Sequence, residues 1–239
     1  ALGQSGEALK AVLRSTSFRA AVRAEIAAPA SFRLFNGEWD QLHITEAATE
    51  KYRALEQKPF GALAASLGQD PLDLMLDIAL EEDLQTVFTA MLLNSDEEAV
   101  GRMLTHPHSI VSLSDAGAHL TFFNDAGFGL HLMGHWVRER GVMQLPEAVR
   151  RLTSHSAELF GFKNRGYLRE GYAADLLLFD PATVGRSPKK RVFDLPGGAP
   201  RLTTDALGVH GVWVNGQMVA NAQGMMPNAP LAGQLLRGV

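Results

Sequence analysis

Residues 114–119 read Ser-Asp-Ala-Gly-Ala-His, and they place a carboxylate directly after an apolar run. The run itself, residues 109–113, is short and rich in β-branched side chains, which predicts a buried strand. Asp115 stands at the carboxyl end of that strand, and a helical pattern begins near Gly127 after a small-residue loop. In a β/α barrel the carboxyl ends of the strands carry the chemistry, so Asp115 is a candidate catalytic residue.

Three further motifs lie downstream of Asp115. Residues 151–161 read RLTSHSAELFG, residues 165–181 read RGYLREGYAADLLLFDP, and residues 212–216 read VWVNG. In order and spacing, these motifs resemble the C-terminal part of the amidohydrolase superfamily, in particular its D-aminoacylase branch (N-acyl-D-amino-acid deacylases). The resemblance extends over roughly residues 60–220.

The resemblance implies an α/β fold that holds the last two strands of a (β/α)8 TIM-like barrel and part of the small β-sandwich domain of amidohydrolases. The first of these strands is expected at residues 84–93, and the second ends at Asp115. Helical and strand patterns alternate over residues 71–140, which predicts parallel strands joined by crossover helices. A complete barrel takes about 250 residues, so we expect this chain to be the back part of a longer protein.

The change of pattern along the chain predicts four segments. They are a helical or inserted segment over 1–58, a partial barrel over 59–161, a partial β-sandwich over 162–226 and a tail over 227–239. Short strands bounded by glycines are expected at 166–168, 175–179, 211–214 and 217–219. Residues 181–207 are rich in Pro, Gly and basic side chains, and this composition predicts a long loop.

In the first segment, hydrophobic spacing over residues 5–28 predicts one helix that ends at Pro29. Asn36-Gly37 is a hairpin signal, and strands are expected on either side of it. Those strands cover 32–35 and 42–44. Further helices are expected at 60–67, 70–82 and 96–104, the second of them with Asp70 as its cap.

The resemblance implies a role for Asp115 as a metal ligand and as the group that transfers protons. A carboxylate suits both tasks, because its oxygens bind hard metal ions and can accept a proton from water. Zinc is the implied cofactor of the complete protein, and its histidine ligands are expected on earlier barrel strands. We therefore expect this chain to retain no zinc and to be inactive alone.

His119 and Asp125 follow Asp115 closely and are the candidate substrate-binding residues. D-aminoacylases usually carry His-Pro-Arg in this loop, where the Arg is thought to hold the substrate carboxylate, and this chain departs from that pattern. The expected substrate is a small N-acyl-D-amino acid or a related N-acyl amine. A cyclic-amide hydrolase of the hydantoinase or dihydroorotase type, or a non-enzymatic assembly fragment, are the alternatives.

The remaining histidines of interest are predicted to be structural. His106 and His108 precede their strand, so they are expected on a solvent-exposed loop at the face opposite the catalytic one. His131 and His135 have the i, i+4 spacing of a zinc-binding helix, but Leu132 stands where a metalloprotease carries its Glu. His155 is expected at a junction between helices.

The composition excludes several classes of function. The 239 residues carry a formal net charge of −4, which argues against a nucleic-acid-binding surface. There is no cysteine, so disulfides and thiolate metal sites are excluded. No apolar run reaches the roughly 18 residues that a membrane span needs. A cytoplasmic protein is expected, and it is expected to form homo-oligomers through the exposed barrel edge at residues 84–93.

Overall fold

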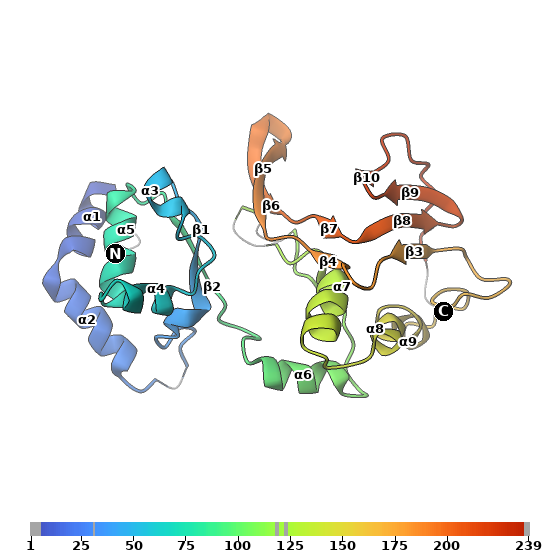
Figure 1. Ribbon diagram of the computed structural model, residues 1–239, viewed down its shortest axis with the longest axis horizontal. Helices are drawn as coiled ribbons and strands as arrows, with labels where there is room; N and C mark the ends of the chain where they lie inside the picture. The colour runs from blue at the N-terminus through green and yellow to red at the C-terminus, as the bar shows by residue number, and fades with distance from the viewer. Residues whose placement is uncertain (1–5, 31, 118–119, 122–123, 237–239) are drawn as a thin grey trace. The chain divides into compact units, whose positions relative to one another are not determined.

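The computed structural model describes residues 6–30, 32–117, 120–121 and 124–236 (Figure 1). The chain divides into two compact units, Ala1–Val100 and Gly101–Val239. The boundary between them falls inside the segment expected to be the partial barrel. The four predicted segments stay predictions.

The N-terminal helical region consists of two helices instead of the one predicted. Helix α1 spans Gly6–Arg14 and α2 spans Thr16–Ala27. Ser15 separates them because it adopts an extended conformation and caps α2, its Oγ accepting a hydrogen bond from the Phe18 amide at 3.4 Å.

A two-stranded antiparallel sheet lies in the first unit. Strand β1 covers Leu42–Glu46 and pairs with β2, Val87–Ala90. The predicted hairpin partner of β1, residues 32–35, is not a strand. Burial explains this pairing, because Leu42 and Ile44 alternate toward the core and Ile44 faces Phe88 across the ladder. The assembly of copies through this region stays a prediction.

Helices cover this sheet and complete the core of the first unit. They are η1 Trp39–Gln41, α3 Glu50–Arg53, α4 Phe60–Ser66 and α5 Pro71–Glu81. Phe60, fully buried, meets the Phe88 ring edge-on at 5.8 Å between centroids. The predicted cap of α5 is confirmed, since Asp70 accepts a hydrogen bond from the Asp73 amide at 3.0 Å.

The second unit begins with helices and ends with strands. Its helices, of which α6 crosses the unit boundary, are α6 Glu97–Thr105, α7 Phe128–His131, the π-helix η2 Leu132–Glu139, α8 Leu145–Leu152 and α9 Ser154–Leu159. Four antiparallel strands then form a sheet in the order β10-β9-β8-β3 (Figure 1). They are β3 Leu176–Phe179, β8 Val209–Val214, β9 Gln217–Asn221 and β10 Gly224–Met225. Three of the expected strands are thereby confirmed, and the one at 166–168 is not a strand.

The predicted long loop at 181–207 is wrong, because most of this segment is paired. Strand β5, Lys190–Leu195, forms a hairpin with β6, Ala199–Thr203. Two further short strands, β4 Gly185–Arg186 and β7 Ala206–Leu207, pair beside it. The glycines that suggested a loop make the hairpin turn η3, Pro196–Gly198, where Gly197 and Gly198 take φ values of 72° and 71°.

The strand predicted before Asp115 is also wrong. Residues 109–113 carry no strand ladder, and Leu113 is 81% exposed. A strand needs a neighbouring chain to bond its backbone groups, and the described residues supply none here. Together with the antiparallel pairing of β2, this leaves the predicted pair of parallel barrel strands unconfirmed. The fold of the described residues is mixed α/β.

The described helices include none that is long and apolar enough to cross a membrane.

Candidate active-site segment around Asp115

A buried arginine binds the start of the chain segment that leads to Asp115. Arg151 lies on α8 and is only 3% exposed. Its guanidinium donates hydrogen bonds to the backbone carbonyls of Thr105 at 2.9 Å, Ser109 at 3.2 Å and His106 at 3.3 Å. Its Nε also bonds Glu147 at 2.8 Å. One side chain therefore ties the end of α6 and the start of the extended segment to α8.

Asp115 itself lies in a tight turn at the end of that segment. Its φ of 51° is in the left-handed region, which Asp tolerates better than most residues. The Ser114 hydroxyl accepts a hydrogen bond from the Ala116 amide at 3.2 Å, and Gly117 continues the turn with a φ of 107°. The Asp115 residue is exposed. The turn therefore presents the Asp115 carboxylate to solvent.

The loop that follows Asp115 is anchored on the β5–β6 hairpin. Leu202 of β6 donates its amide to the Leu120 carbonyl at 2.8 Å and accepts from the Asn124 side chain at 2.7 Å. Arg191 of β5 donates to the Thr121 carbonyl at 3.0 Å. Asn124, 4% exposed, also accepts from the Ala126 amide at 2.8 Å.

Sequence reasoning missed these anchors because they join residues about 80 positions apart. The one local signal was the Asn-Asp pair at 124–125, which is typical of turns.

Of the two candidate substrate-binding residues, the structure describes only Asp125. Asp125 is held between two cations, with Lys189 at 3.0 Å and Arg186 at 3.6 Å. These ion pairs join the loop to the segment around β4. His119 lies outside the described residues. A role in substrate binding stays a prediction for both.

His131 and His135 form a stacked pair on the helical segment after the loop. Their rings are 4.9 Å apart between centroids and inclined by only 4°. The Trp136 ring meets the His135 ring edge-on at 5.1 Å, and Glu139 lies 3.0 Å from the His135 Nδ1. Both histidine rings thus pack near Trp136, and the structural role predicted for them stays a prediction.

The other histidines lie apart from this pair. His106 and His108 are exposed on a turn, as predicted, and the His108 amide donates to the His106 Nδ1 at 3.2 Å. His155 lies in α9 with a buried Nδ1 that meets no hydrogen-bond partner in the described part of the chain.

A zinc centre does not fit the residues that the structure describes. Across those residues, no group of three or more His, Asp or Glu side chains is placed to hold a metal ion. Asp115 could supply one oxygen ligand, but catalytic zinc in proteins has three protein ligands. We therefore assign no zinc-dependent step to this part of the chain.

The stability of the second unit is expected to fall in mildly acidic solution because of His131. Burial, the Arg186 guanidinium and His135 together lower the pKa of His131 to about 4 from its ordinary value of 6.5. His131 therefore binds a proton near pH 6.5 in the unfolded chain but only near pH 4 in the folded chain. As the pH falls from 6.5 to about 4, the free energy of unfolding decreases by up to about 2 kcal/mol after allowance for solvent screening.

Urea unfolding between pH 7.5 and pH 4.5 measures this loss. His131→Gln should reduce the slope of the unfolding free energy with pH, whereas His106→Gln, at an exposed site, should leave it unchanged. An identical slope in both variants would show that His131 does not control the response.

The family model for the amidohydrolase family matches residues 37–220, a range that includes Asp115, Asp125 and the β5–β6 hairpin. The chain belongs to the amidohydrolase family. Among its relatives, a D-aminoacylase of Alcaligenes xylosoxydans xylosoxydans is 40% identical over 92 residues, which are 38% of this chain and 17% of that protein. An N-acyl-D-aspartate deacylase of the same organism is 29% identical over 177 residues, 71% of this chain and 33% of the relative.

Among solved structures, this amidohydrolase chain matches an N-acyl-D-glutamate deacylase of Bordetella bronchiseptica complexed with zinc and a phosphonate inhibitor. The identity is 28% and the TM-score is 0.43, over 80% of this chain and 36% of the other. The resemblance to D-aminoacylases predicted from the motifs is confirmed by these relatives. The chain spans no more than a third of the length of the two curated relatives described above.

Proposed function

We propose that this chain contributes the Asp115 segment to a metal-dependent amidohydrolase that hydrolyses an amide C–N bond in an N-acyl-D-amino acid or a related N-acyl amine. The observation that carries the proposal is the family match over residues 37–220, which contains Asp115. The exposed left-handed turn at Asp115 supports it, because a carboxylate there is open to small molecules.

In this proposal Asp115 moves the protons of the reaction. Water adds its oxygen to the carbonyl carbon of the amide and gives a proton to the Asp115 carboxylate. The C–N bond then breaks, and the same proton passes to the departing nitrogen. The products are a carboxylic acid and an amine, so atoms and charge balance. A positioned carboxylate of this kind contributes about 10²–10⁴-fold to a rate.

The anchors of the Asp115 segment support its role, because proton transfer needs a fixed donor and acceptor. Arg151 holds the residues before Asp115, and the β5–β6 hairpin holds the residues after it. Zinc is the cofactor that we propose for the complete enzyme, as the motifs imply. Its ligands other than Asp115 are proposed to lie outside the residues described.

The test is to compare the 239-residue chain with the complete enzyme that we propose. We expect the dialysed chain to hold almost no zinc by elemental analysis and to release no amine from N-acetyl-D-amino acids. The complete enzyme is expected to hold zinc and to release the amine. Tightly held zinc in the short chain would overturn the assignment of the ligands. A complete enzyme that cleaves only cyclic amides would overturn the substrate class.

A further inference from the structure

The first two helices are attached to the first unit in an unusual way. Neither α1 nor α2 contributes a buried residue. The buried cluster of this unit is built from β1, α3, α4 and α5, with side chains such as Ile44, Tyr52, Phe60 and Ile78. The two helices therefore lie outside the hydrophobic core that stabilises the unit.

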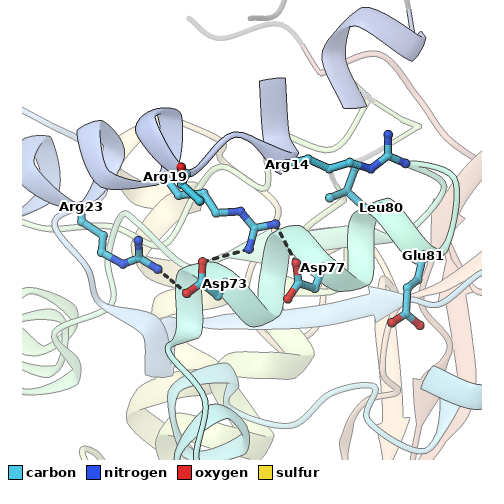
Figure 2. A pocket seen from close by; sticks show the side chains of 8 residues that line it. Arg14, Arg19, Arg23, Asp73, Asp77, Leu80 and Glu81 are labelled. Atoms are coloured by element: carbon cyan, nitrogen blue, oxygen red, sulfur yellow. Dashed lines mark hydrogen bonds and ion pairs between the residues drawn. The ribbon is translucent and has the colours of Figure 1, made fainter. Parts of the chain in front are cut away.

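Ion pairs hold α2 against α5, and Lys10 of α1 pairs with Asp83, two residues beyond the end of α5. Arg19 of α2 donates to Asp73 at 2.9 Å and to Asp77 at 2.6 Å (Figure 2). Arg23 bonds the same Asp73 and also Asp70 at 3.0 Å. Asp73 thus accepts from two arginines at once.

The charges follow the helical repeat. Asp70, Asp73 and Asp77 are spaced by three and four residues, so their side chains form one stripe along α5. The arginines at 19 and 23 are spaced by four on the facing helix.

The stripe of ion pairs does not continue to Arg14. Figure 2 shows Arg14 lying over Leu80, while Glu81 turns away from Arg14. Glu81 instead bonds Lys51 and the Tyr52 hydroxyl, so the stripe of ion pairs ends before Arg14.

The space between the helices is open instead of closely packed. A pocket of about 640 Å³ lies there, lined by the three arginines at 14, 19 and 23 and by the carboxylates of α5. The carboxylates of Asp73 and Asp77 are 37% and 52% exposed. Ion pairs that water reaches in this way are screened by dissolved salt.

We propose that the α1–α2 pair is an electrostatic strap, which docks on α5 at low ionic strength and releases at high ionic strength while the core of the first unit stays folded. Release uncovers the face of α5 that carries the acidic stripe. The released state therefore exposes the three carboxylates along this face of α5.

The salt dependence of the attachment distinguishes this strap from a helix pair that is held by apolar packing. Raising sodium chloride from about 0.01 M to about 1 M shortens the screening length from about 30 Å to about 3 Å, which removes most of the attraction between exposed charges. Apolar burial is not weakened by that change. A strap that depends on ion pairs must therefore loosen, and a packed core must not.

Hydrogen exchange followed by mass spectrometry tests the proposal in the 239-residue chain. We expect amide exchange in residues 6–27 to rise about tenfold between the two salt concentrations, while exchange in α4 and β1 stays constant. Asp73→Asn should produce a smaller rise in the same residues at low salt, because it removes the carboxylate shared by Arg19 and Arg23 but leaves their bonds to Asp77 and Asp70. Glu25→Gln is the matched control, since Glu25 lies on α2 and forms no ion pair within the described residues.

Exchange in residues 6–27 that does not respond to salt would overturn the proposal. So would a rise that α4 and β1 share, because the unit would then be unfolding as a whole. If Asp73→Asn unfolds the unit, which circular dichroism would reveal, the salt titration of the unaltered chain still decides the question.

Discussion

Asp115→Asn is expected to lower the kcat of the proposed complete enzyme by about 10²–10⁴-fold, with a small effect on KM. An amide is almost the same size as a carboxylate, but it cannot accept the proton of the attacking water. Asn is also well tolerated at the φ of 51° that Asp115 adopts, so the turn should be preserved. The decrease in kcat would therefore reflect the loss of proton transfer and not a change in folding.

Asp83→Asn is the control for this substitution. Asp83 has a similar left-handed φ of 57° and pairs with Lys10 in the first unit. Steady-state amine release should fall for Asp115→Asn and stay unchanged for Asp83→Asn. Zinc content measured on both variants shows whether Asp115 also ligates the metal. A kcat for Asp115→Asn equal to that of the unaltered enzyme would remove Asp115 from the reaction.

Arg151→Met is expected to give the largest loss of stability, about 2–4 kcal/mol in the free energy of unfolding of the second unit. Methionine keeps the apolar stem of the side chain but removes its hydrogen-bond donors. The carbonyls of Thr105 and Ser109 then lose this donor at a partly buried site, whereas the His106 carbonyl keeps the bonds from the Ser109 amide and hydroxyl. Glu147 is not orphaned, because Arg150 still bonds both of its oxygens.

Arg150→Met separates this effect from the loss of a charge on α8. Arg150 bonds the same Glu147, but its side chain is 45% exposed, so its removal should cost less than about 1 kcal/mol. Urea unfolding measures both variants, and hydrogen exchange shows whether residues 106–115 loosen in Arg151→Met. Equal costs for the two substitutions would mean that the carbonyl contacts of Arg151 contribute nothing.

The parts of the fold that the sequence predicts correctly depend on local signals. Helices α4, α5 and α6 come with a cap or a proline at the start, as at Asp70 and Pro71, and these features act within one turn of helix. Strands β8 and β9 flank Asn215-Gly216, a dipeptide that favours a tight turn between antiparallel strands.

The errors arise where a partner far away in the chain decides the structure. Residues 109–113 have the composition of a strand, but composition cannot supply the neighbour that a ladder needs. At 181–207 the glycine content predicts a loop, whereas Gly197 and Gly198 close a hairpin. For the site, the position of Asp115 could be proposed from its motif. The hydrogen bonds from Arg151 to this segment could not be predicted, because they go to backbone carbonyls, which every residue has, and so leave no pattern in the sequence.

The bonds between the β5–β6 hairpin and the loop after Asp115 use main-chain atoms of the loop at Leu120 and Thr121. Substitution of those two side chains would leave the carbonyl groups in place and the anchoring intact. The side chains at these two positions can therefore change without disturbing the attachment of the loop. A library randomised at 120 and 121, with Asn124 and Leu202 retained, is accordingly a practical starting point for altering the selectivity of the enzyme that we propose.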